Sequence, residues 1–175
     1  ICAGILAMQS GLPVKHFIAA CNANDIVTDY LKTAQLKPKQ AVATLSNAMD
    51  VGNPSNFVRI LEIFRHHFPE LKSKLSSYSI TDNETMAIIK EVYGKESYVL
   101  DPHGAVGYLS LQRYLQSNPG LKGLFLETAH PVKFPEAVEG GIGQPVEIPL
   151  SLQPIMRKNK QSVFIRPAYQ DLKDF

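Results

Sequence analysis

The chain has 175 residues, the size of one ordinary domain or of part of a larger one. Hydrophobic residues make up 45% and charged residues 19%, and the 11 glycines and 12 prolines are close to average usage. This composition excludes a disordered, collagen-like or low-complexity protein. The net charge of +2, with scattered basic residues, gives no electrostatic case for a nucleic-acid partner.

The longest nearly apolar stretch, Ile1 to Met8, is shorter than the roughly 20 residues that a membrane-spanning helix needs. We therefore expect no membrane span. The stretch also lacks the positive start and the small-residue cleavage site of a signal peptide, which favours a cytoplasmic protein. Cys2 and Cys21 stand in no metal-ligand spacing and are too few for a disulfide framework, so we expect buried thiols.

The first elements follow the order helix, strand, helix. Ile1 to Ser10 predicts a helix that ends before Gly11, Val14 to Cys21 predicts a core strand, and Ile26 to Thr33 predicts the next helix. This order is typical of the middle of a βαβ array. Because the opening helix has no N-cap, no preceding strand and no initiator Met, we expect the sequence to be a fragment of a longer protein.

The central part begins with a short predicted strand at Val42 to Leu45, which leads into the polar loop Ser46 to Gly52. Asn53 as the N-cap and Pro54 as the first helical residue predict a helix that runs to about Phe68.

Capping patterns place two later helices. Thr81 with Glu84 forms a capping-box pattern and predicts a helix at Asp82 to Tyr93. A second helix, preceded by an Asp-Pro capping pair, is expected from Asp101 to about Gln116, and Gly123 to Glu127 predicts a buried strand.

From Gln144 onward several prolines interrupt the pattern, with a short strand expected at Ser162 to Ile165 and a helix at Tyr169 to Phe175. Strands separated by helices predict a three-layer, doubly wound α/β fold with a mainly parallel sheet and helices on both faces. Residues 1–143 are expected to form part of a large α/β domain, and residues 144–175 a carboxyl-terminal extension packing on it.

Three predicted strand ends carry polar clusters, and parallel strands would bring them to one crevice. Such a lining of neutral hydrogen-bonding groups suits a polar, anionic small molecule. Each residue type is also a common turn former or helix cap, so a structural role remains an alternative. The clusters are Asn22, Asn24 and Asp25; Ser46, Asn47, Asp50 and Asn53; and Thr128 with His130.

Other chemical signals are weak. Glu62, His66 and His67 predict a solvated helix face, because no third metal ligand is near them in the sequence, and we expect no metal site. For His130, a functional role and a backbone-bonded imidazole are both open. The run Gly140 to Gly143 follows a helix rather than a strand, and no dinucleotide-binding or Walker motif is present.

Three longer segments follow one another along the chain: ATLSNAMDVGNPSNF (Ala43 to Phe57), LDPHGAVGY (Leu100 to Tyr108) and ETAHPVKFPE (Glu127 to Glu136). In this order they closely resemble the threonine synthase family, pyridoxal-phosphate enzymes of the tryptophan-synthase-β fold type. FIAACNAND (Phe17 to Asp25) is similar to the family sequence that follows its glycine-rich loop. The resemblance spans nearly the whole chain and corresponds to the carboxyl-terminal part of such an enzyme.

The resemblance implies a lyase of threonine biosynthesis that converts O-phospho-L-homoserine and water to L-threonine and phosphate. Pyridoxal 5'-phosphate would drive γ-elimination and β-addition, and residues 1–143 would belong to the cofactor-binding domain. The Schiff-base lysine and the phosphate loop of the family lie upstream. The chain alone is therefore expected to hold no catalytic residue, to lack cofactor, to be inactive and to self-associate through exposed surface.

Carried over by residue, Thr128 resembles the hydroxyl that bonds the pyridine nitrogen of the cofactor. Asp50, Asn53, Ser55 and Asn56 are candidate substrate contacts, with the last three at an expected helix N-terminus that could bind phosphate oxygens. The competing hypothesis is a non-catalytic α/β module that binds an anion or a partner. A cysteine or tryptophan synthase relative is disfavoured by the long AMDVGNPSN loop.

Overall fold

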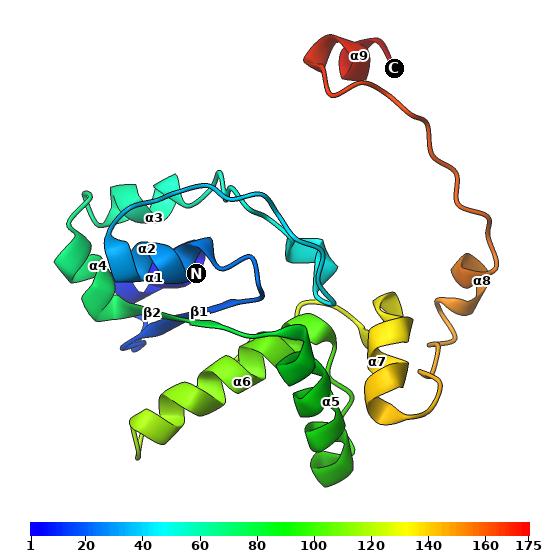
Figure 1. Cartoon of the computed structure of the whole chain (residues 1–175), viewed down its shortest axis with the longest axis horizontal. Coiled ribbons are helices and arrows are strands. Elements are labelled where there is room, and N and C mark those ends of the chain that lie inside the picture. Colours follow the sequence, from blue (N-terminus) through cyan, green and yellow to red (C-terminus); the bar gives the residue numbers. More distant parts are fainter.

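The computed structural model describes all 175 residues. Its centre is a pair of parallel strands, β1 (Phe17–Cys21) and β2 (Leu75–Ser79). Helices lie on both faces of this pair (Figure 1), so the expected α/β architecture with a parallel sheet between helical layers is confirmed. One face carries α1 (Cys2–Gln9), α2 (Ile26–Thr33), α3 (Val58–Ile63) and α4 (Phe68–Lys74), and the other carries α6 (Pro102–Ser117), on which α5 (Asp82–Glu96) packs.

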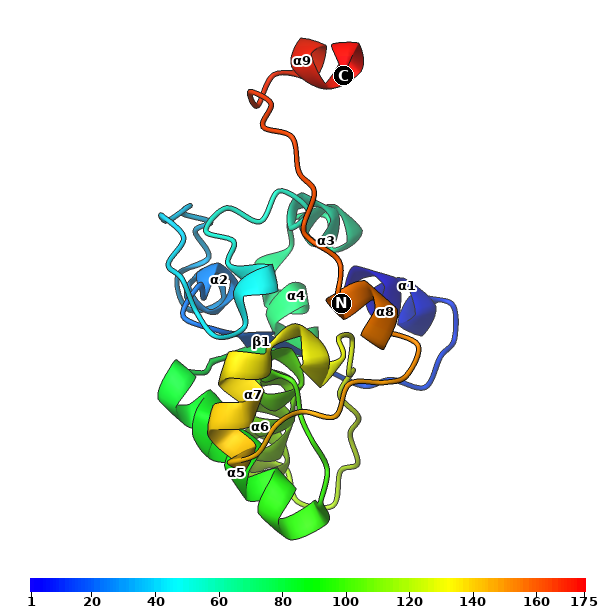
Figure 2. The ribbon, with the colours of Figure 1, turned by 90° about the vertical axis from the view of Figure 1, so that its right-hand side faces the viewer.

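Three apolar clusters hold these layers together. The largest lies between the sheet and α1 to α4, the second joins α5 to α6, and the third surrounds α7 (Pro135–Ile142), which packs against α5. Figure 2 shows α5, α6 and α7 gathered below the strands. The buried residues of the three clusters include, in the same order, Ile5, Tyr30, Phe57, Leu71 and Leu75; Ile88, Ile89, Leu100 and Ala105; and Phe134, Ala137 and Val138.

Several predicted elements are confirmed. Helix α1 ends at Gln9 with Ser10 as its C-cap, and Gly11 follows with a φ of 104°, a conformation that glycine adopts without strain. Helix α2 has the predicted bounds. The capping box of α5 is present, since Glu84 N donates to Thr81 Oγ1 at 3.3 Å and Thr81 N donates to Glu84 Oε2 at 2.8 Å.

The single helix predicted from Asn53 to Phe68 is wrong. The chain instead forms α3 and α4, separated by a turn in which Arg65 and His66 have φ values of 48° and 56°. Pro69 explains the interruption, because proline has no N–H and would clash with the carbonyl four residues earlier in a continuous helix. It is tolerated in the first turn of α4, where no such bond is needed.

The strands predicted at Val42–Leu45, Gly123–Glu127 and Ser162–Ile165 are also wrong, because none of them has a hydrogen-bonded neighbour strand. In the segment Val42–Leu45, a side chain replaces a neighbouring strand as the hydrogen-bond partner of the backbone: Val42 N donates to Asn24 Oδ1 at 2.9 Å. Strand β2 was not predicted, because its sequence, LSSYS, is rich in serine and does not favour a strand by itself. Its extended conformation follows from its pairing with β1.

Beyond α7 the chain leaves the body of the molecule (Figure 1). Val146 still packs against the α7 cluster, whereas α8 (Gln153–Met156) and α9 (Tyr169–Asp174) have no buried side chain. Helix α9 confirms the expected terminal helix. The division at residue 143 remains a proposal. No helix has both the length and the apolar character that crossing a membrane requires.

Candidate functional site

Two of the three polar clusters lie in direct contact at the end of β1. Asn22, only 7% exposed, donates from Nδ2 to Thr44 Oγ1 and Ser46 Oγ, both at 2.9 Å, and to Asp50 Oδ1 at 3.1 Å. The same Asp50 oxygen accepts from Asn24 Nδ2 at 3.0 Å, and its other oxygen accepts from Thr44 N at 2.9 Å. The network ties the loop to the strand end.

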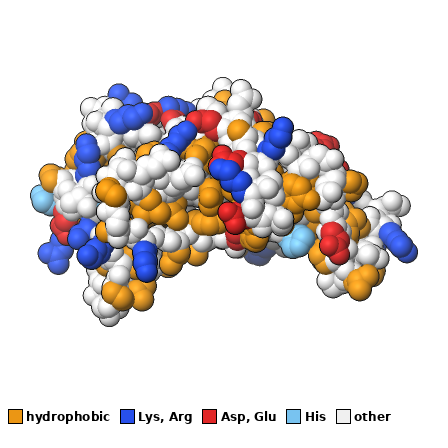
Figure 3. Space-filling model, turned by 90° about the horizontal axis from the view of Figure 1, so that it is seen from below, with side chains coloured by type: hydrophobic (Ala, Val, Ile, Leu, Met, Phe, Trp, Pro, Cys, Tyr) orange, Lys and Arg blue, Asp and Glu red, His pale blue; other side chains and the backbone are white.

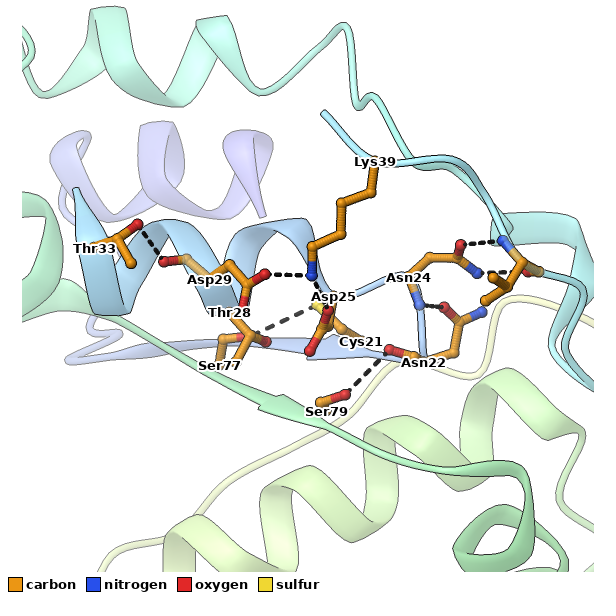
Figure 4. Close-up of polar contacts among 11 residues, drawn as sticks. Cys21, Asn22, Asn24, Asp25, Thr28, Asp29, Thr33, Lys39, Ser77 and Ser79 are labelled. Atoms are coloured by element: carbon orange, nitrogen blue, oxygen red, sulfur yellow. Dashed lines mark hydrogen bonds and ion pairs between the residues drawn. The ribbon is translucent and has the colours of Figure 1, made fainter. Parts of the chain in front are cut away.

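The start of α2 is fixed to Lys39, in the segment between α2 and the polar loop (Figure 4). Lys39 Nζ lies 3.2 Å from Asp25 Oδ1 and also pairs with Asp29. The hydrogen bond from Lys39 holds the pKa of Asp29 below its ordinary value. Both pairs are exposed enough to be screened by solvent, so their role is to orient the loop rather than to add much stability.

A seam of small polar groups joins α2 to the sheet. Thr28 Oγ1 lies 2.6 Å from Ser77 Oγ, which donates to the carbonyl of Ala19 at 2.7 Å, and Cys21 Sγ lies 3.5 Å from the same hydroxyl. Burial raises the pKa of the Cys21 thiol, which favours the protonated form. Cys21 and Cys2 are free and half-buried.

The candidate substrate residues of the polar loop and of the segment after it differ in their hydrogen bonding. Both carboxylate oxygens of Asp50 accept hydrogen bonds within the network. By contrast, Asn53, Ser55 and Asn56 are exposed and their side chains form no hydrogen bond within the chain. They precede α3 but do not cap it, because its N-cap is Phe57, so the expected helix N-terminus at Asn53 is wrong.

Thr128 is exposed and its hydroxyl makes no hydrogen bond within the chain. Its neighbour Ala129 and Leu45, which directly precedes the polar loop, pack against the same α7 cluster, which brings the third polar cluster to the side of the molecule that holds the loop. His130 Nδ1 accepts from Val132 N at 3.2 Å and caps the short helix Pro131–Lys133, which favours the structural interpretation of this histidine.

A carboxyl pair beside Thr128 was missed by the sequence analysis. Asp101 is fully buried, and its Oδ1 caps α6 by accepting from His103 N at 2.8 Å. Glu127 lies against it and is exposed as a residue, but partial desolvation of its carboxyl group together with the Asp101 carboxylate raises the pKa of Glu127 to about 8. The one local signal was Gly104 in the first turn of α6, where a Cβ atom would fall on the Glu127 carboxyl group.

The histidines of the α3–α4 turn form no metal site. His66 Nε2 lies 2.9 Å from Glu62 Oε1 and His67 Nδ1 lies 3.6 Å from Glu70 Oε2, and all four side chains are more than half exposed. The structure contains no group of three or more metal-ligating His, Cys, Asp or Glu side chains.

Comparisons with known proteins bear on the family of the chain. A family model described as "Threonine synthase, C-terminal" matches residues 104–175. The chain is 46% identical over 150 residues to threonine synthase of Serratia marcescens, and 41% identical over 173 residues to threonine synthase of Buchnera aphidicola. The chain belongs to the threonine synthase family. These matches cover 86% and 99% of the chain but only 34% and 39% of those proteins, so the chain spans little more than a third of their length.

Solved structures of the threonine synthase family share the fold. The crystal structure of threonine synthase from Escherichia coli has a TM-score of 0.88 and 41% identity, covering 99% of this chain and 40% of that one. A structure described as PLP-bound threonine synthase from Brucella melitensis has a TM-score of 0.80 and 26% identity, covering 98% of this chain and 42% of that one.

Proposed function

We propose that this chain forms part of a threonine synthase that converts O-phospho-L-homoserine and water to L-threonine and phosphate with pyridoxal 5'-phosphate. The observation that carries the proposal is the match along the whole chain, with 41% identity and a TM-score of 0.88 over 99% of its length. The choice of cofactor is supported by the Brucella melitensis enzyme, whose crystal structure is that of a PLP-bound threonine synthase.

The free polar groups of the chain fit this cofactor and substrate. Thr128 has an exposed hydroxyl without an internal partner, and a neutral hydroxyl can donate to a pyridine nitrogen, whereas an aspartate would hold that nitrogen protonated. Asn53, Ser55 and Asn56 offer neutral donors for phosphate oxygens. In this scheme Asp50 shapes the loop through its contacts with Asn22 and Thr44 rather than meeting the substrate.

When bound, the cofactor supplies an electron sink for the negative charge that develops on substrate carbon. The residues of this chain then orient and bind. Thr128 would fix the ring through its nitrogen, and the loop amides would hold the phosphate group of the substrate in register with it. Because the loop is tied to the end of β1, these donors would be held in place before the substrate arrives.

The chain by itself is proposed to be inactive, because the family resemblance gives none of its lysines the Schiff-base role. Self-association also remains a prediction. Figure 3 shows apolar side chains spread in a band across the face of the molecule that it presents, and among the exposed apolar residues are Leu124 and Leu126, which are 78% and 72% exposed.

The test uses a full-length enzyme that carries this segment, with Thr128→Ala compared with Thr128→Ser. We expect the alanine variant to shift the visible absorption of the cofactor and to lower phosphate release from O-phospho-L-homoserine by at least about tenfold, equivalent to about 1.4 kcal/mol of transition-state stabilisation. The serine variant retains the hydroxyl and should stay close to the wild type.

Unchanged spectra and kinetics in Thr128→Ala would refute the role of Thr128. The chain alone serves as the negative control of the same assay, and phosphate release by it would overturn its proposed inactivity. A full-length enzyme that binds an anion but neither the cofactor nor the substrate would favour the non-catalytic module.

A further inference from the structure

The segment that carries Thr128 is held to the body by side chains alone. Residues 122–129 form no backbone–backbone hydrogen bond. Phe125 packs on the cluster between α5 and α6, with its ring 5.6 Å from the ring of Tyr108 in an edge-to-face arrangement. Glu127 provides the next contact, directly before Thr128 in the chain, and its geometry therefore bears on where that hydroxyl lies.

The partner of Glu127 is a carboxylate with an unused oxygen. Asp101 is 0% exposed, and its Oδ2 atom accepts from no N–H or hydroxyl group of the chain. A buried carboxylate oxygen without a donor is costly, and few such atoms occur in folded proteins. The Glu127 carboxyl group occupies the space above Gly104, the third residue of α6, and lies within hydrogen-bonding reach of the Asp101 side chain.

We propose that Glu127 is a positioning residue: its protonated carboxyl donates a hydrogen bond to the Asp101 carboxylate and thereby fixes the adjacent Thr128. One proton shared by two carboxyl groups satisfies the free Asp101 oxygen and removes the repulsion between two negative charges. The significance of this position for the cofactor rests on the proposed function, whereas the pairing itself does not.

The surrounding groups leave Glu127 without a cation. The charge that acts on Glu127 comes from Asp101. Tyr98 lies in the segment before α6, and its pKa is raised by burial and then by the charges of Glu127 and Asp101. His103, the nearest histidine on α6, directs its ring to Phe134 at 5.1 Å, and its Nε2 is buried without a partner. A proton on Glu127 is therefore the available means of neutralising the pair.

The first experiment measures the Glu127 carboxyl directly in the complete chain. Carbon-detected NMR titration is expected to give a pKa near 8, and the amide resonance of Thr128 should move with the same midpoint. In Glu127→Gln the side-chain amide still donates to Asp101, so the Thr128 resonance should lie near its neutral-pH position and lose the titration. In Glu127→Ala it should lie away from that position at every pH.

The second experiment follows thermal unfolding of the same variants. At pH 6 the wild type and Glu127→Gln should melt at similar temperatures, whereas at pH 9 the wild type should melt a few degrees, about 2–4 °C, lower. Glu147→Gln is the matched control, because Glu147 is exposed and its side chain forms no hydrogen bond or ion pair, and it should follow the wild type at both pH values.

A Glu127 pKa near the ordinary 4.5 would overturn the pairing. The positioning role would be overturned if the pKa of Glu127 is raised but the Thr128 amide resonance changes neither with the titration of Glu127 nor in the Glu127→Ala variant. Neither measurement depends on cofactor binding, so failure of this inference and failure of the proposed function are separable.

Discussion

One glutamate lies in the first turn of α5 and another, from the segment after α6, lies against the first turn of α6, and their pKa values shift in opposite directions. At α5 the backbone and hydroxyl of Thr81, followed by Arg113, lower the pKa of Glu84 to about 2. At α6 burial and Asp101 raise the pKa of Glu127 to about 8. Both helix ends favour negative charge, yet only Glu84 is ionised at neutral pH. Desolvation and the partner that each carboxyl meets, rather than the helix end, decide its charge.

The two sites also differ in how their partners come together. Glu84 reaches Thr81 within one helical turn, so its geometry follows from the local sequence. Glu127 reaches Asp101 only because the segment after α6 folds back along that helix. A local site of this kind tolerates changes elsewhere in the chain, whereas the second site requires the tertiary fold.

The largest expected effect comes from Asp101→Ala. The change removes the α6 cap to His103 N and leaves the Glu127 carboxyl without its acceptor. We expect the free energy of unfolding to fall by about 2 kcal/mol at pH 6, measured by urea denaturation. Asp101→Asn is the control, since asparagine also caps helices, and it should lose about half as much. An alanine variant as stable as the wild type would contradict the importance of this site.

A smaller effect distinguishes two glycines of α6. In Gly104→Ala the new Cβ displaces the Glu127 carboxyl, whereas in Gly107→Ala the nearest atom, on Phe125, is at an ordinary 3.6 Å. Both changes gain helix propensity, about 0.5–1 kcal/mol. Gly104→Ala should lose that gain, so the two variants should differ by about 1 kcal/mol in denaturation at pH 6. Equal stabilisation of both would show that Glu127 does not need the space.

The helices were largely predictable because their signals are local. Thr81, Asp101 and Gly11 each indicate a helix boundary through a cap or a turn within a few residues, and the structure has those boundaries. Pro69 is an equally local signal that α3 cannot continue into α4, but the helix predicted to end at Phe68 stops one residue before it and misses the turn at Arg65 and His66.

The strands were less predictable because a strand is defined by its neighbour. Gly123–Glu127 has a suitable apolar sequence but no partner, while serine-rich β2 is a strand because β1 lies beside it. The site shows the same difference between local signals and contacts made only in the folded chain. Polar residues at strand ends indicated the contact between Asn22 and Asp50, but no spacing in the sequence could indicate the pair of Asp101 and Glu127.

The smallest expected effect completes the comparison from the side of α5. Glu84→Gln should lower the free energy of unfolding at pH 7 by about 0.5 kcal/mol, because Glu84 and Arg113 are both about one-third exposed and their attraction is screened. Thermal unfolding in low and high salt measures this value, and high salt should reduce it. Glu96→Gln, an exposed change at the far end of α5, is the matched control.

The pH dependence of that difference separates the two helix starts. The folded pKa of Glu84, about 2, lies below its ordinary 4.5, so its contribution is present above pH 4.5 and is lost as the pH falls towards 2. The folded pKa of Glu127 is raised, so its contribution is present below pH 4.5 and is lost as the pH rises through about 8. The difference in melting temperature between wild type and Glu84→Gln should therefore disappear as the pH falls towards 2. As the pH rises through about 8, the melting temperature of Glu127→Gln should rise relative to that of the wild type. Parallel profiles for the two variants would mean that one common environment, rather than two different partners, governs both carboxyl groups.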